Sequence, residues 1–108
     1  GSSEVDWVGV DAYDTTGAGF SAMLSPIYTL VSPFAKPVLL AETGETATDQ
    51  QAFFTDALTV LQNQFPMVNG LMYYDGTNAF GNWSLSPGGA AALAGLAASP
   101  YFSASGSL

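Results

Sequence analysis

Three short apolar segments, each with a carboxylate at its end, recur along the chain at almost constant spacing. The acids that end them, Asp11, Glu42 and Asp75, are separated by 31 and 33 residues. A strand, a helix and the return to a neighbouring parallel strand take about 30 residues or more. The spacing therefore predicts an α/β fold built from three consecutive βα units with parallel strands.

The predicted strands cover residues 5–11, 37–42 and 70–75. The second and third are nearly continuous apolar runs, whereas the first alternates more. Continuous runs are typical of parallel strands in a sheet that is covered on both faces. We therefore expect one α/β domain over residues 1–102, followed by a flexible Ser- and Gly-rich tail at residues 103–108.

Each predicted helix has a recognisable start. Ser25-Pro26 places Pro at the first position of a helix that runs to about residue 32. The pattern Thr48-Asp49-Gln50-Gln51 is typical of a capping box at the start of the second helix. Glu45, like Asp49, is expected to stabilise that helix start through the helix dipole. Ser86-Pro87 begins the third helix, which is predicted to end near residue 98.

The composition argues against several classes of function. The chain has nine acidic residues, a single base at Lys36 and no His, for a formal charge of -8. One cation cannot neutralise a run of phosphates or favour an anionic membrane surface, so we expect no nucleic acid and no membrane as partners. Because Cys and His are absent, thiol or Ser-His catalysis and the usual zinc ligands are excluded, and we expect no metal and no cofactor. Carboxylates and tyrosines remain for catalysis.

These remaining groups are expected to gather at one rim of the sheet. The carboxyl ends of parallel strands meet at the same edge, where the βα loops assemble sites. The residues expected there are Asp11, Glu42 and Asp75 with Tyr13, Tyr73, Tyr74 and Trp83. Carboxylates beside exposed rings suit carbohydrate chemistry, because acids act as nucleophile or proton donor and rings stack on the apolar faces of sugars. The pattern favours a function on sugars.

Several stretches of the chain, in order, resemble one enzyme family. They are residues 5–14 (VDWVGVDAYD), 36–44 (KPVLLAETG), 65–66 (FP), 72–75 (MYYD) and 82–85 (NWSL). They resemble strands six to eight of the (β/α)8 barrels of family 26-like glycoside hydrolases, a group of β-mannanases and related β-glucan and xylan hydrolases. The resemblance implies that residues 1–102 are the C-terminal portion of a TIM barrel. The remaining N-terminal part, in the same or another chain, would then be a partner.

The resemblance also implies roles for individual residues. Glu42 matches the acid that ends strand seven, which is the catalytic nucleophile of that family. Tyr13 matches a Tyr that hydrogen-bonds the nucleophile and helps to hold it ionised. Tyr73 takes the place of an aromatic residue, usually Trp, that forms a sugar platform. The family's general acid/base is a Glu at the end of strand four. A full barrel needs about 250 residues, so the 108 residues here have no strand four.

The expected function is therefore part of a retaining hydrolase of β-linked polysaccharide (mannan, glucan or xylan), inactive without the rest of its barrel. The alternative is a non-catalytic glycan-binding or assembly domain that kept the barrel scaffold. A third hypothesis is a small α/β domain that folds alone and binds a partner protein. The acidic, Lys-poor composition fits a secreted, extracellular protein.

Simpler structural roles compete with a role in the site at each of these positions. Glu42 can be a solvated strand end before a Thr-Gly turn, and Tyr13 can pack in the core. Asp11 and Asp75 lie where a carboxylate can cap a loop or start a turn. Trp83 can fill the loop after the last strand instead of contacting a sugar. Tyr73 and Tyr74 alternate along a strand, so at most one of them points into the site while the other packs against helices.

Overall fold

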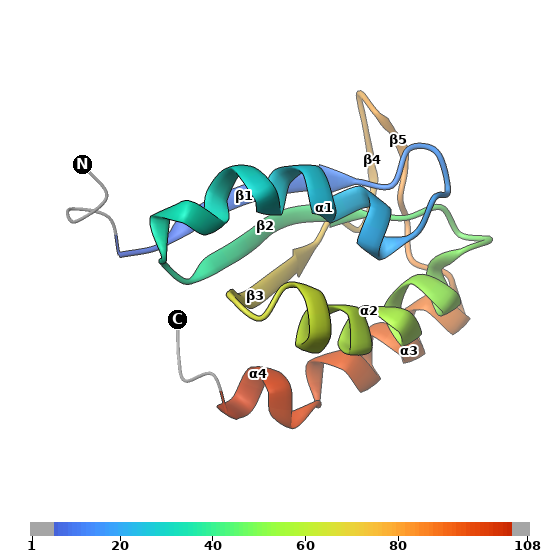
Figure 1. Ribbon diagram of the computed structural model, residues 1–108. Coiled ribbons are helices and arrows are strands. Elements are labelled where there is room, and N and C mark those ends of the chain that lie inside the picture. The colour runs from blue at the N-terminus through green and yellow to red at the C-terminus, as the bar shows by residue number, and fades with distance from the viewer. Residues whose placement is uncertain (1–5, 105–108) are drawn as a thin grey trace.

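The computed structural model describes residues 6–104, in which helices alternate with parallel strands (Figure 1). The elements, in chain order, are β1 (Val8–Tyr13), α1 (Phe20–Val31), the 3₁₀ helix η2 (Ser32–Phe34), β2 (Val38–Gly44), α2 (Gln50–Gln64), β3 (Val68–Tyr73), β4 (Thr77–Asn78), β5 (Gly81–Asn82), α3 (Pro87–Ala97) and α4 (Pro100–Ala104). The strands β1, β2 and β3 form one parallel sheet in that order. The three predicted βα units with parallel strands are confirmed.

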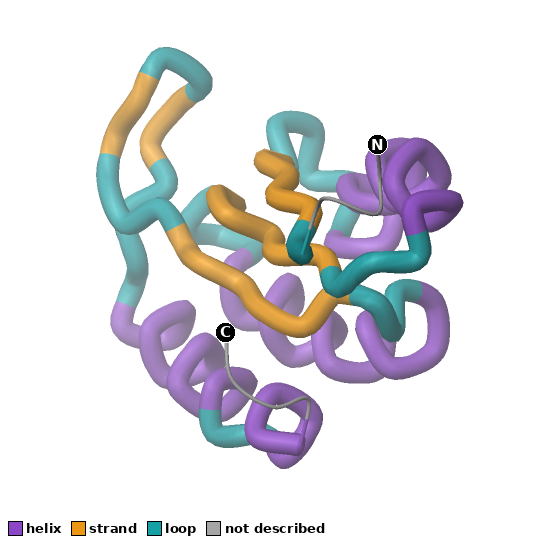
Figure 2. The backbone as a smooth tube through the Cα atoms, turned by 90° about the vertical axis from the view of Figure 1, so that its left-hand side faces the viewer, coloured by secondary structure: helices purple, strands orange, loops and turns teal. Residues whose placement is uncertain are grey.

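The helices lie on one side of this sheet (Figure 1, Figure 2). Two parallel crossovers of the same right-handed sense place their helices on the same side. The core lies between the two layers, where Val38, Leu40 and Val68 of the sheet are buried with side chains of α1 and α2. The opposite face is exposed at Gly9 and Met72. Within the described residues, helices therefore cover one face of the sheet, whereas the sequence predicted that both faces are covered.

The first helix begins at Phe20 and not at Ser25-Pro26, so Pro26 lies inside α1. No side-chain hydrogen bond caps this helix. The carboxylate of Asp14, a buried residue, instead holds the loop that leads into it, because it accepts hydrogen bonds from the backbone N–H groups of Ala18 and Gly19, each at 3.0 Å. The local Ser-Pro pattern could not show that contact.

The capping box predicted at the start of α2 does not form. The residue before the helix is Asp49, and no side-chain hydrogen bond caps it. Gln50 points inward and is fully buried. The prediction for α3 is confirmed, because the Ser86 hydroxyl accepts a hydrogen bond from the backbone N–H of Gly89 at 3.0 Å.

Three elements after β3 were not expected. The short strands β4 and β5 pair antiparallel as a hairpin that projects beyond the sheet (Figure 2), and two-residue strands are too short to leave a periodic pattern. Helix α4 includes residues 103 and 104, which were expected in the flexible tail. The rest of that tail, 105–108, and residues 1–5, where the first strand was predicted to begin, lie outside the described residues. No described helix is long and apolar enough to span a membrane.

Candidate functional site

The central strand β2 contains a β-bulge beside the candidate site. Val10 pairs with Leu40, but the next residue of β1, Asp11, pairs with Glu42, so β2 holds one extra residue there. The pairing with β3 shifts between Leu40 and Thr43 as well. A bulge of this kind bends a strand and changes the direction of the side chains that follow it.

The bulge decides which face of the sheet carries Glu42. In a regular strand, Glu42 would share the buried face of Val38 and Leu40, because alternate residues point the same way. Thr43 takes that face instead, where it is fully buried and its hydroxyl lies 3.6 Å from the Met23 sulfur. Glu42 is exposed. Its carboxylate is therefore accessible at the carboxyl end of the central strand.

Tyr13, the last residue of β1, orients this carboxylate by donating a hydrogen bond from its hydroxyl to Oε1 of Glu42. The pKa of Tyr13 is raised to about 12, mainly by burial and further by the hydrogen bond to Glu42 and its charge. The phenol therefore keeps its proton around neutral pH and remains a donor. A carboxylate held by such a donor and open to solvent can act as a nucleophile or as a hydrogen-bond acceptor.

Tyr13 also lies at the centre of an aromatic cluster formed by Tyr13, Tyr74, Phe80 and Trp83. The distances from the Tyr13 ring centroid to the other three centroids are 6.3, 5.5 and 5.1 Å, in that order. Trp83 is only 2% exposed, and its indole N–H donates to Oδ1 of Asn78 at 2.9 Å. Trp83 is thus the buried base of the cluster and fills the loop after β3.

Gly44 allows the two largest rings of the cluster to approach the end of β2. A Cβ atom at this position would lie 2.8 Å from the Tyr13 ring and 2.9 Å from the Trp83 ring. These distances are shorter than any normal contact, so a side chain at Gly44 would displace Tyr13 from its place beside Glu42.

Of the two tyrosines at the end of β3, Tyr74 joins the aromatic cluster and Tyr73 does not. The Tyr73 ring packs edge-on against Phe54 of α2, with 5.2 Å between centroids, and its hydroxyl donates to the backbone oxygen of Trp83 at 2.6 Å. The expected alternation of the two side chains is present. The residue beside Tyr13, however, is Tyr74 and not Tyr73, which was expected to form the platform.

The two other predicted acids differ in their surroundings. Asp11 is exposed and pairs with Glu42 across β1 and β2, next to Tyr13. Asp75 follows β3, and its Oδ1 accepts a hydrogen bond from the backbone N–H of Leu85 at 2.8 Å. The structure therefore brings Asp11, Glu42 and Tyr13 together, while Asp75 holds the loop that leads to α3.

A buried pair of carboxyl groups, Asp14 and Glu45, lies in the loops after β1 and β2. Their exposed fractions are 2% and 1%. The pKa of Glu45 is raised to about 8, mainly by burial and further by its hydrogen bond with Asp14. Glu45 is therefore protonated at neutral pH, and it hydrogen-bonds Asp14, whose carboxylate holds the loop before α1.

The expectation that Glu45 acts as a charge on the dipole of α2 is wrong, because the buried group is neutral there. The pair joins two loops that flank the candidate site. Sequence reasoning missed it because Asp14 and Glu45 are 31 residues apart and meet only through the pairing of β1 with β2.

The Asp14–Glu45 pair predicts a dependence of stability on pH. The pKa of Glu45 in the folded state is above its ordinary value of 4.5, so its contribution is fully present below about pH 4.5 and is lost as pH rises to about 8. The free energy of unfolding should fall across this window, with a slope of up to about 1.4 kcal/mol per pH unit. Urea unfolding of the complete folded protein at several pH values measures this slope.

Glu45→Gln is expected to reduce the slope, because the amide keeps a hydrogen-bond donor but does not titrate. The matched control is Asp56→Asn, which changes an exposed acid on α2 and should leave the slope as it is. An undiminished slope in Glu45→Gln would contradict the assignment.

Within the described residues, no group of three or more His, Cys, Asp or Glu side chains could hold a metal ion. Comparison with protein-family models and with curated proteins found no match to this chain. The groups at this rim that can act on a ligand are Glu42, Tyr13 and the aromatic cluster.

Proposed function

We propose that this chain is the C-terminal portion of the (β/α)8 barrel of a retaining glycoside hydrolase resembling family 26, acting on β-linked polysaccharide. The observation that carries the proposal is the hydrogen bond from Tyr13 to Glu42 at the carboxyl end of the central parallel strand. Enzymes with this architecture build their sites at that end of the strands. Glu42 is assigned as the nucleophile and Tyr13 as the residue that positions it.

In the proposed reaction, the Glu42 carboxylate attacks the anomeric carbon while an acid protonates the departing glycosidic oxygen. The glycosyl ester formed at Glu42 is then hydrolysed by water, which the same acid, now a base, deprotonates. Tyr13 donates to Oε1 and so aims the carboxylate. Trp83 and Gly44 hold the Tyr13 ring in place.

The proton donor is assigned to another part of the barrel. Asp75 is engaged with the Leu85 amide, and Asp14 and Glu45 are buried. Asp11 lies on the strand next to Glu42, on the same arc of the rim, whereas the acid must approach the glycosidic oxygen from across the cleft. The chain alone is therefore expected to be inactive.

The open shape of the sheet supports a barrel. Within the described residues, β1 and β3 each pair with β2 alone, and closure of a barrel would pair both free edges. A cavity of about 330 Å³ flanks β3 and is lined by residues that include Leu71, Leu93 and Leu96. These features suit burial against further strands and helices, which the proposal assigns to the N-terminal part of the barrel.

A non-catalytic glycan-binding domain remains the alternative, and the aromatic cluster favours it as a second candidate. Phe80 is 67% exposed beside Tyr13, so the rim can stack a sugar even where no bond is cleaved. In that case Glu42 would accept hydrogen bonds from sugar hydroxyl groups. The two candidates differ in whether a covalent bond forms at Glu42.

Covalent trapping in the complete protein that contains this chain tests the proposal. Activated 2-deoxy-2-fluoro-β-glycosides slow the hydrolysis of the glycosyl ester, so the ester should accumulate on the peptide that carries Glu42. Mass spectrometry of the digest should find one sugar on Glu42, in step with loss of activity. A label on another carboxylate, or hydrolysis with inversion and no label, would contradict the proposal. Glycan binding without hydrolysis would support the binding domain.

A further inference from the structure

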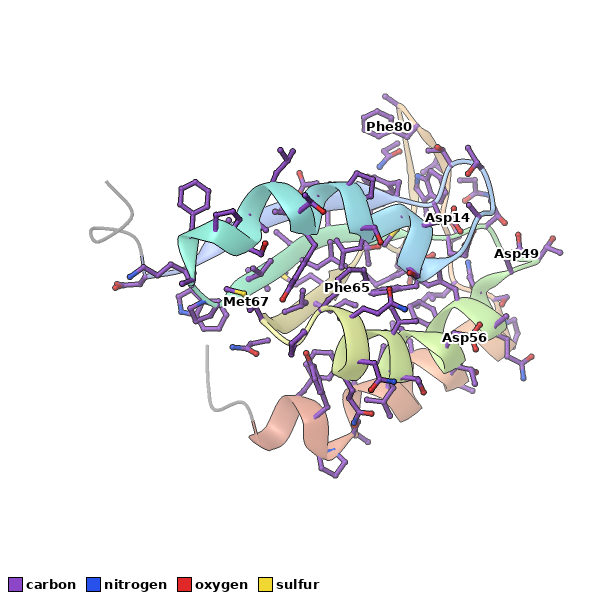
Figure 3. The ribbon with its side chains drawn as sticks, viewed as in Figure 1. Asp14, Asp49, Asp56, Phe65, Met67 and Phe80 are labelled. Atoms are coloured by element: carbon purple, nitrogen blue, oxygen red, sulfur yellow. The ribbon has the colours of Figure 1, made fainter. Side chains whose placement is uncertain are left out.

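We infer that Phe80, between β4 and β5, is a sugar-stacking residue that extends the site beyond Glu42; this rests on the proposed function. Figure 3 shows Phe80 at the tip of the hairpin, away from the helices. The side chain is 67% exposed, and its ring centroid lies 5.5 Å from that of Tyr13. An exposed aromatic ring packed against Tyr13, which itself hydrogen-bonds the proposed nucleophile, offers a stacking surface next to the site.

The hairpin holds Phe80 in place before any ligand arrives. The side-chain oxygen of Asn78 accepts hydrogen bonds from the Phe80 backbone N–H and from the Trp83 indole N–H, each at 2.9 Å. The backbone N–H of Trp83 also donates to the oxygen of Gly76 at 2.7 Å. Because the loop is already tied to the buried Trp83, little ordering is needed when a ligand stacks on Phe80.

The groups around Phe80 suit a sugar better than an apolar protein segment. A pyranose ring has an apolar face of C–H groups and a rim of hydroxyl groups, so it needs an aromatic face next to hydrogen-bond acceptors. Glu42 and Asp11 supply exposed carboxylates beside the cluster. An apolar partner would desolvate these carboxylates without hydrogen-bonding them, which is costly.

The position of Phe80 also indicates which sugar it contacts. Tyr13 touches both Phe80 and Glu42, so Tyr13 lies between the aromatic ring and the nucleophile. Phe80 therefore stacks on a sugar next to the one that Glu42 attacks. A substrate with a single sugar would not reach it.

The test is isothermal titration of cellohexaose, mannohexaose and xylohexaose into the complete protein carrying Glu42→Gln, which binds without turnover. Adding Phe80→Ala should weaken the Kd for the hexaose that binds by about tenfold, and Phe80→Trp should keep it. Phe34→Ala, which removes an exposed Phe in η2, is the matched control and should not change the Kd.

Two outcomes would overturn the inference: an unchanged Kd in Phe80→Ala, or binding of none of the hexaoses to the Glu42→Gln protein. An unchanged Kd together with a lower Tm in Phe80→Ala would show that Phe80 packs against another part of the protein instead. A different result would contradict the proposed function itself: the complete protein would hydrolyse no polysaccharide and would carry no covalent label on Glu42.

Discussion

Replacing Glu42 with Ala in the complete protein is expected to lower kcat on polysaccharide by roughly 10⁴-fold or more, because the nucleophile of a covalent mechanism is lost. The fold should tolerate the change, since Glu42 is exposed and its side chain is bonded to Tyr13 alone among the described residues. Steady-state kinetics measure the loss, and the Tm checks that the variant is folded.

Azide distinguishes a missing nucleophile from other damage to the site. In Glu42→Ala, azide can enter the space of the carboxylate and attack the anomeric carbon of an activated aryl glycoside, which gives a glycosyl azide of inverted configuration. Asp11→Asn and Asp75→Asn should weaken activity without such rescue, because neither residue is assigned as nucleophile. Near-normal activity of Glu42→Ala would remove the assignment and favour the binding domain.

Replacing Gln50 with Ala is expected to lower the free energy of unfolding by about 4 kcal/mol or more, enough to unfold a marginally stable domain. Gln50 is fully buried. Its amide nitrogen donates to the backbone oxygens of Glu45 at 3.0 Å and Ser84 at 2.9 Å, and its oxygen accepts from the Ser86 N–H at 2.9 Å. Truncation would remove these hydrogen bonds and leave a void where the buried side chain was, while the Glu45 oxygen keeps its hydrogen bond from the Tyr73 hydroxyl at 2.9 Å.

The matched control for this prediction is the neighbouring residue. Gln51 is also in the first turn of α2, but it is exposed, so Gln51→Ala should change stability by about 0.5 kcal/mol or less. Urea unfolding of the complete protein compares the two variants. Similar effects at both positions would contradict the role given to Gln50, which is to join α2 to the loop before α3.

The local patterns that failed were placed at the wrong residue. Ser25-Pro26 has the form of a helix start, but α1 begins five residues before Ser25, at Phe20. Thr48 to Gln51 has the form of a capping box with Thr48 as its cap, but α2 begins at Gln50, one residue later than that box requires, and no side chain caps it. The Ser86 cap was predictable because both of its partners lie within one turn of α3.

One feature of the sequence could have predicted that the ring of Phe80 is exposed. Phe80 lies in a stretch rich in Gly and Asn, residues 75–82, where an aromatic side chain has no core to join. Its position beside Tyr13 could not have been found, because that contact depends on how the β4–β5 hairpin folds back on Trp83.

The parallel βα architecture and the position of Asp11 and Glu42 near strand ends could be predicted, because apolar runs and their spacing are local properties of the chain. The face of the sheet that carries Glu42 could not, since the bulge arises from the pairing of β2 with its neighbours. The tertiary structure likewise decided that Tyr74, and not Tyr73, joins Tyr13. Strand register and contacts between distant residues set these outcomes, and no local pattern encodes them.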